Sequence, residues 1–252
     1  MNTLSEERAS KVPEVTLAFW AIKIAATTLG ETAGDAVSMS LDLGYLVGTL
    51  IFSAIFIAAV LVQIRAVRFH PVLYWATIIA TTTLGTTIAD FADRSLGIGY
   101  AGGTLLLASL VVASLAVWYK TLGTISVASV RSPASEAFYW VTIMFSQTLG
   151  TALGDWTADA PALGYSGSAV IFGAALAVVA ACYFWTRISH TTLFWAAFIL
   201  TRPLGAVVGD LMDKPLDEGG FAMSRFTASA ALLAFIAVGL VAFPHRAAKQ
   251  AH

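Results

Sequence analysis

Cysteine, histidine clusters and charge are scarce in this sequence, and each scarcity excludes a class of protein. The single cysteine, Cys182, cannot form an internal disulfide, and no CxxC pair or Cys/His cluster supplies a soft-metal site. Only 12% of the 252 residues are charged, about half the share that a soluble domain carries. The net charge of -1 and the lack of a polybasic run exclude nucleic acid as an expected partner. No HExxH, GxSxG or Walker A sequence occurs, so we expect no enzyme.

Hydrophobic residues dominate instead, at 58% of the chain, and the mean hydropathy of +0.79 predicts a membrane protein. The first thirteen residues lack the basic start and apolar core of a signal peptide, so we expect the first apolar segment to be a retained span. A crossing helix needs about 20 apolar residues, and such stretches recur eight times without the alternation typical of strands. The prediction is an all-α membrane protein. Its expected transmembrane helices cover residues 15–37, 45–64, 71–92, 100–118, 137–157, 165–185, 192–212 and 222–243.

The distribution of basic residues predicts the orientation. Nine bases fall at the chain ends or in the loops after even-numbered spans, and three fall in the other loops. By the positive-inside rule both termini are then cytoplasmic, and we expect a multi-pass protein of the bacterial inner membrane. Trp118 and Trp185, at cytoplasmic helix ends, are expected in an interfacial aromatic belt. The nine bases are Arg8, Lys11, Arg65, Arg68, Lys120, Arg131, Arg187, Arg246 and Lys249, and the three are Arg94, Lys214 and Arg225.

One eight-residue pattern occurs four times, as TLGETAGD, TLGTTIAD, TLGTALGD and PLGAVVGD, starting at residues 28, 83, 148 and 203. A tryptophan precedes each copy at the same distance, so one unit of two helices has been copied four times. Because each unit crosses the bilayer twice, all four point the same way and any symmetry axis lies along the membrane normal. A ring of four units around a central path is the simplest arrangement, and a pairing of two halves is its rival. The tryptophans are Trp20, Trp75, Trp140 and Trp195.

These repeats define the domain organisation as two halves of two repeats each. The ten extra residues between repeats 2 and 3 predict a cytoplasmic linker between the halves. The expected segments are an N-terminal segment 1–14, repeat 1 at 15–65, repeat 2 at 71–119, a linker 120–136, repeat 3 at 137–187, repeat 4 at 192–243 and a tail 244–252.

On these motifs the chain resembles the uncharacterised bacterial family of membrane proteins with four tandem two-helix repeats, each with a tryptophan. The resemblance covers about residues 15–243 and implies the eight-helix topology. The fourth repeat departs from the pattern, with Pro203 in place of threonine and no tyrosine after its motif. No activity is carried over from the resemblance.

Each repeat ends its motif on an aspartate, and these four residues are the centre of the functional hypothesis. A carboxylate at the centre of a membrane helix costs about 2.5–3.5 kcal/mol, and one near a helix C-terminus faces the negative end of the dipole. If each first helix continues to the glycine at Gly44 and its equivalents, the aspartates lie about two turns inside the helix. Retention of four such acids indicates a bound cation or a basic partner, and wetted interfacial residues are the alternative. The four are Asp35, Asp90, Asp155 and Asp210.

Further polar residues share the helix face of these aspartates. Glu31 lies one turn before Asp35, and Lys23 lies two turns before Glu31. Arg202 occupies the corresponding face in repeat 4. We interpret Lys23 and Arg202 as counter-charges, each in a neutralising salt bridge to Glu31 or an aspartate. For Lys23 the alternative is a coupling group that is released when a cation binds. The polar residues aligned with Arg202 are Thr27, Thr82 and Gln147.

Carboxylates with hydroxyl and amide oxygens favour a hard cation. The leading hypothesis is a transporter or exporter of a divalent metal ion, Mn²⁺ ahead of Mg²⁺, with the four aspartates as metal ligands assisted by Glu31. Export is chosen because no ATP-binding motif occurs. We expect no cofactor, and expect the lipid bilayer, the metal substrate and optionally further copies of the chain as partners. The alternatives are a membrane scaffold or sensor accessory protein with structural ion pairs, and a transporter of a small organic cation held by aromatic rings.

Overall fold

The computed structural model describes residues 10–248, and the regular elements in that range are helices. Eight of them are long, two from each repeat. Arg8 and Lys249, used above for orientation, lie outside the described residues, as do the rest of segments 1–9 and 249–252. The long helices are α2 (Leu17–Asp35), α3 (Gly44–Arg65), α4 (Pro71–Asp90), α5 (Tyr100–Leu122), α6 (Pro133–Ala158), α7 (Gly164–Trp185), α8 (His190–Asp213) and α9 (Arg225–Ala242).

Four short elements complete the described chain: the π-helical turns η1 (Ala36–Ser40) and η2 (Phe91–Ser95), and the 3₁₀ turns η3 (Val127–Ser129) and η4 (Leu216–Glu218). The start of α6 differs from its expected bound for a local reason. Helix α6 begins at Pro133, before the expected residue 137, because Ser132 caps it by accepting a hydrogen bond from the Ser135 amide at 3.2 Å.

Six of the described helices are long and apolar enough to cross a membrane: α3, α4 with η2, α5, α7, α8 and α9. Helices α2 and α6 fall outside this set, and α2 carries Lys23, Glu31 and Asp35 within 19 residues. Both helices are largely buried inside the protein. In contrast, at most 22% of the residues in the most apolar stretches of α3, α5, α7 and α9 are buried. The polar helices therefore lie inside, and the most apolar helices face outward.

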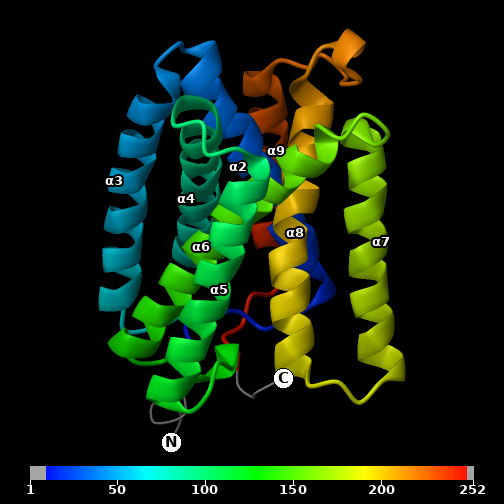
Figure 1. Cartoon of the computed structure of the whole chain (residues 1–252). Helices are drawn as coiled ribbons and strands as arrows, with labels where there is room; N and C mark the ends of the chain where they lie inside the picture. The colour runs from blue at the N-terminus through cyan, green and yellow to red at the C-terminus, as the bar shows by residue number, and fades with distance from the viewer. Residues whose placement is uncertain (1–9, 249–252) are drawn as a thin grey trace, which may run out of the picture.

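The first helices of the four repeats form a closed inner ring. Helix α2 packs on α4 and α8, and α6 packs on the same two helices (Figure 1). Each second helix packs on the first helix of the next repeat: α3 on α4, α5 on α6, α7 on α8, and α9 back on α2. The repeats thus interlock in a ring, the simpler of the two arrangements expected from the sequence.

Glycines allow the inner helices to approach closely. The first glycine of each motif faces the aligned polar residue of a neighbouring helix, so that Gly30 meets Thr82, Gly85 meets Gln147, Gly150 meets Arg202 and Gly205 meets Thr27. A Cβ atom at Gly85 would lie 2.9 Å from the backbone carbon of Gln147. Small residues at helix interfaces permit this packing in membranes, and the same contact repeated four times closes the ring.

Aromatic side chains near the starts of α2, α4, α6 and α8 pack together at one end of the ring. The hydroxyl groups of Tyr74 and Tyr139 are hydrogen-bonded there at 2.6 Å. Trp118 is fully buried and lies edge-on to Trp195, so the prediction of an interfacial position is wrong for this residue. Aromatic packing on the next helix hides it from the lipid-facing surface. Trp185 is 84% exposed, as an interfacial residue would be.

The glycine contacts lead to a stability prediction. We expect Gly85→Ala to lower the free energy of unfolding by about 1–3 kcal/mol, because backbone atoms of α6 cannot move aside for the new methyl group. Thermal unfolding of the purified protein in detergent measures the loss. Gly173→Ala in α7 is the matched control, because nothing lies within 4 Å of the added Cβ. Equal unfolding temperatures for the two variants would contradict the close packing.

Candidate functional site

The guanidinium group of Arg202 lies fully buried at the centre of the inner ring. From α8 it reaches the other three inner helices. Its Nη1 donates to the backbone carbonyl of Thr27 at 3.0 Å, and its Nε donates to that of Gln147 at 3.3 Å. Its Nη2 lies 2.9 Å from Glu31 Oε2 and donates to two hydroxyl oxygens, those of Thr86 and Thr151. Arg202 therefore fills the middle of the ring and ties all four inner helices together.

Glu31 is the acid that neutralises this cation. Its side chain is buried, and it also accepts a hydrogen bond from Thr86 at 3.2 Å. The sequence analysis expected a neutralising salt bridge from Arg202 to Glu31 or an aspartate, and in the structure the partner is Glu31. A buried guanidinium requires such a carboxylate, because an uncompensated charge in an apolar interior costs several kcal/mol.

The four repeat aspartates are buried within one helical turn of the ends of the inner helices. Asp35 and Asp90 are the last residues of α2 and α4, and each precedes a π-helical turn. Asp155 and Asp210 are followed by three more residues of α6 and α8. The expected depth of two turns is therefore wrong, because Gly44 and Gly164 begin the next helices with positive φ instead of capping the preceding ones.

Two basic residues divide the aspartates into two pairs. Arg94 Nε lies 2.9 Å from Asp90 Oδ1, and Arg94 Nη2 lies 4.0 Å from Asp155 Oδ2. Lys214 Nζ lies 3.0 Å from Asp210 Oδ1 and 3.1 Å from Asp35 Oδ2. The aspartates are thus turned away from solvent, and each pair shares one basic residue.

A third base, Arg225 at the start of α9, adds to the second pair. Its Nε lies 2.8 Å from Asp213 Oδ2 and 3.7 Å from Asp35 Oδ2. Burial by itself would lower the pKa of Lys214, but the carboxylates of Asp210, Asp35 and Asp213 outweigh burial and raise that pKa above its ordinary value. Lys214 is therefore a protonated cation at neutral pH.

Three carboxylates converge close to this lysine. Glu31, Asp35 and Asp210 each offer an oxygen atom, and the three atoms lie within 4.8 Å of one another. All three residues are buried. Carboxylate oxygens at this spacing suit a hard cation with bonds of about 2.0–2.6 Å after a small adjustment of the side chains. Asp90 and Asp155 do not belong to this cluster of described residues, so the structure brings together three of the five acids expected to bind metal.

Lys23 lies apart from these acids. Its Nζ is buried without a hydrogen-bond partner or salt bridge among the described residues, and it sits 4.1 Å from the ring centre of Phe198. The salt bridge to Glu31 or an aspartate, one of the two expectations for Lys23, does not form in this structure because Arg202 occupies the position beside Glu31.

The aligned polar residues lie around Arg202, but mainly their backbones contact it. The carbonyl groups of Thr27, Thr82 and Gln147 accept from the guanidinium. The Thr27 hydroxyl donates to backbone carbonyls, including that of Thr201 at 3.1 Å. The Thr82 hydroxyl and the Gln147 amide are buried without a partner among the described residues. These side chains could therefore still donate or accept hydrogen bonds inside the ring.

The four repeats match one family model, described as Repeat of Unknown Function (DUF347), at residues 18–69, 73–124, 138–189 and 193–248. The chain belongs to this family. No curated protein and no solved structure matches the chain. Each DUF347 repeat thus contributes one inner helix with its motif and one outer helix.

Sequence reasoning missed Arg94 and Lys214 as site residues of the DUF347 chain, treating them only as bases of the outer loops. A signal was present, because each lies four residues after a repeat aspartate, a spacing that brings side chains together on a helix. Thr86 and Thr151 were also missed, although each follows an aligned polar residue by the same interval.

The buried pair predicts a double-mutant result. Arg202→Met leaves Glu31 buried without its cation, and we expect a loss of about 3–5 kcal/mol in the free energy of unfolding. Arg202→Met combined with Glu31→Leu removes both charges and recovers most of that loss. Chemical unfolding of the purified variants in detergent measures both values. Additive losses in the double variant would show that the two side chains do not depend on each other.

Proposed function

We propose that this chain is a membrane transporter of a hard divalent cation, which binds between Glu31, Asp35 and Asp210. The observation that carries the proposal is the convergence of three buried carboxylate oxygens within 4.8 Å from two neighbouring inner helices. Asp90 and Asp155, bridged by Arg94, form a second acidic pair that the ion would pass or use in turn.

The charges at the cluster favour a divalent ion over a monovalent one. Arg202 neutralises one of the three carboxylates through its bond to Glu31. The two remaining negative charges match one divalent cation. We place Mn²⁺ ahead of Mg²⁺ because Mg²⁺ sheds its water less readily, which disfavours it in a buried site.

Lys214 acts in this proposal as a tethered cation that occupies the site between transport cycles. Its ammonium group bridges Asp35 and Asp210 at 3.1 and 3.0 Å, the two acids that the metal would also use. It stands just after the end of α8, where a change in the following loop can withdraw it. Binding of the metal and departure of Lys214 would then keep the buried site electrically balanced.

The membrane setting completes the proposal. We infer that all eight long helices cross the bilayer, with the polar α2 and α6 shielded from lipid by the helices packed around them. The excess of bases on the side of the termini supports a cytoplasmic location of both ends in a bacterial inner membrane. The ion cluster then lies toward the outer side, and Arg202 with the aromatic layers separates it from the cytoplasm.

A scaffold or sensor accessory protein is the second candidate, and the ion pairs favour it. Each of the four aspartates has a basic group within 4.0 Å, so the carboxylates could serve folding alone. The small organic cation is less favoured, because Trp75, Trp140 and Trp195 are buried among other aromatic rings and the pocket lined by Trp20 offers no carboxylate to a cation.

Calorimetric titration with Mn²⁺ tests the metal site. We expect one ion bound per chain, and expect Asp210→Asn to weaken binding at least tenfold because it removes a ligand and its charge. Asp42→Asn, an exposed loop acid outside the cluster, is the matched control. If the protein neither binds Mn²⁺ nor moves it across liposome membranes, the transporter proposal is wrong. The scaffold would then be the function that fits the ion pairs.

A second variant tests the role of Lys214. Lys214→Met removes the competing ammonium group, so we expect the dissociation constant for Mn²⁺ to fall by roughly tenfold, equal to about 1.4 kcal/mol. Turnover in liposomes should fall at the same time, because the vacated acids hold the ion too tightly. Weaker Mn²⁺ binding in this variant would mean that Lys214 organises the site and does not compete for it.

A further inference from the structure

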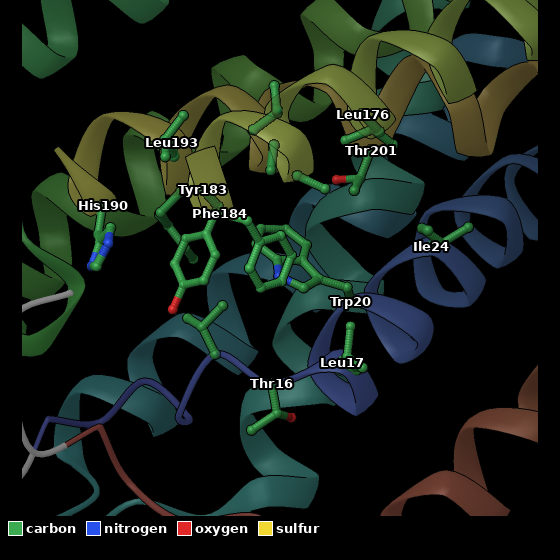
Figure 2. Close-up of a pocket in the computed structure, with 15 residues that line it drawn as sticks. Thr16, Leu17, Trp20, Ile24, Leu176, Tyr183, Phe184, His190, Leu193 and Thr201 are labelled. Carbon is green, nitrogen blue, oxygen red and sulfur yellow. The ribbon is translucent and has the colours of Figure 1, made fainter. Parts of the chain in front are cut away.

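A pocket on the outside of the ring is separate from the ion cluster. It has a volume of about 430 Å³ and lies between the start of α2, the second half of α7 and the start of α8. Figure 2 shows Tyr183 and His190 at one end, Trp20 in the middle, and Ile24 and Leu176 toward the other end.

The lining is apolar over most of its length. Eleven of the fifteen lining residues are aliphatic or aromatic, and the Trp20 indole nitrogen is the one polar atom in their side chains. None of the fifteen is acidic. Two of the four polar ones, Tyr183 and His190, lie near each other at one end of the pocket, and Thr16 lies beside Leu17 (Figure 2). The lack of a carboxylate disfavours an amine, which would enter without a counter-charge. The pocket suits an apolar chain with a polar group at one end.

This pocket breaks the symmetry of the repeats. Trp75, Trp140 and Trp195 are almost completely buried, whereas Trp20 is only partly buried and forms the pocket wall. The equivalent groove beside Trp195 is covered by the linker, whose Ile125 carbonyl accepts from the indole nitrogen at 3.0 Å. No hydrogen bond of this kind to the Trp20 indole is found within residues 10–248, where Trp20 lines the pocket instead.

The pocket lies next to the exposed surface of the outer helix α7. Helix α7 buries only 11% of its most apolar stretch, and its last residues Phe184 and Trp185 are 74% and 84% exposed. Exposed aromatic rings at a helix end are typical of the level of lipid headgroups. In the sequence, Arg187 lies between the lining residues Phe184 and His190, three residues from each.

We propose that this pocket binds one acyl chain of an anionic phospholipid from the leaflet on the side of the termini, with the phosphate beside Arg187 and His190. The choice of an anionic headgroup rests on His190, which lines the polar end, on Arg187 three residues before it in the chain, and on the lack of an acid in the lining that would repel a phosphate. This site would exist whether or not the protein moves metal ions, because it requires only that the protein lies in a bilayer.

Native mass spectrometry of the full chain, released from detergent doped with phosphatidylglycerol or phosphatidylcholine, tests the site. We expect one retained phosphatidylglycerol per chain and at least fivefold less retained phosphatidylcholine. Ala180→Trp fills the pocket from its mouth and should remove the bound lipid. Ala177→Trp is the matched control on the same helix, since residue 177 is exposed and outside the lining.

A double variant tests the headgroup contacts. Arg187→Gln with His190→Gln should bring the retention of phosphatidylglycerol down to that of phosphatidylcholine while thermal unfolding in detergent is unchanged. Equal retention of lipid by Ala180→Trp and the wild-type protein would overturn the pocket as the binding site. Equal retention of the two lipids by the wild-type protein would overturn the choice of an anionic headgroup.

Discussion

The buried ion pair between Arg202 and Glu31 is the interaction on which the rest of this structure depends. A guanidinium carries five donors in one plane, and here they reach α2, α4 and α6 from α8. The inner helices can surround it only because glycine faces it, with Gly150 lying against the Arg202 side chain. Helix packing, the polar interior and the position of the acids are therefore coupled through one side chain.

The four repeats share one backbone plan but have diverged in the residues that carry charge. At the level of Arg202 the other repeats have Thr27, Thr82 and Gln147, and only repeat 1 follows with the acid Glu31. The aspartates then separate into two pairs, one bridged by Arg94 and one by Lys214. Within residues 10–248, a cluster of three carboxylates forms on the side of α2 and α8, where Glu31 joins the second pair. A symmetric scaffold thus holds one asymmetric cluster of carboxylates.

Hydropathy and the repeated motif were sufficient to predict eight helices in four units, because both signals are local in sequence. The same signals could not predict that each outer helix packs on the next repeat, which depends on loop geometry. The burial of the aspartates follows from the cost of exposing acids to lipid, but their pairing through Arg94 and Lys214 depends on where the helices end. Lys23 is the clearest example of what the sequence could not predict. It shares a helix face with Glu31, but the cation that pairs with Glu31 is Arg202, which comes from a distant repeat.

A structure determined with Mn²⁺, using the anomalous scattering of the metal, tests the cation site most directly. The account predicts one anomalous peak at about 2.0–2.6 Å from oxygen atoms of Glu31, Asp35 and Asp210, with the Lys214 ammonium group moved out of the cluster. A cluster that contains no peak at saturating Mn²⁺, with Lys214 still bridging Asp35 and Asp210, would contradict it.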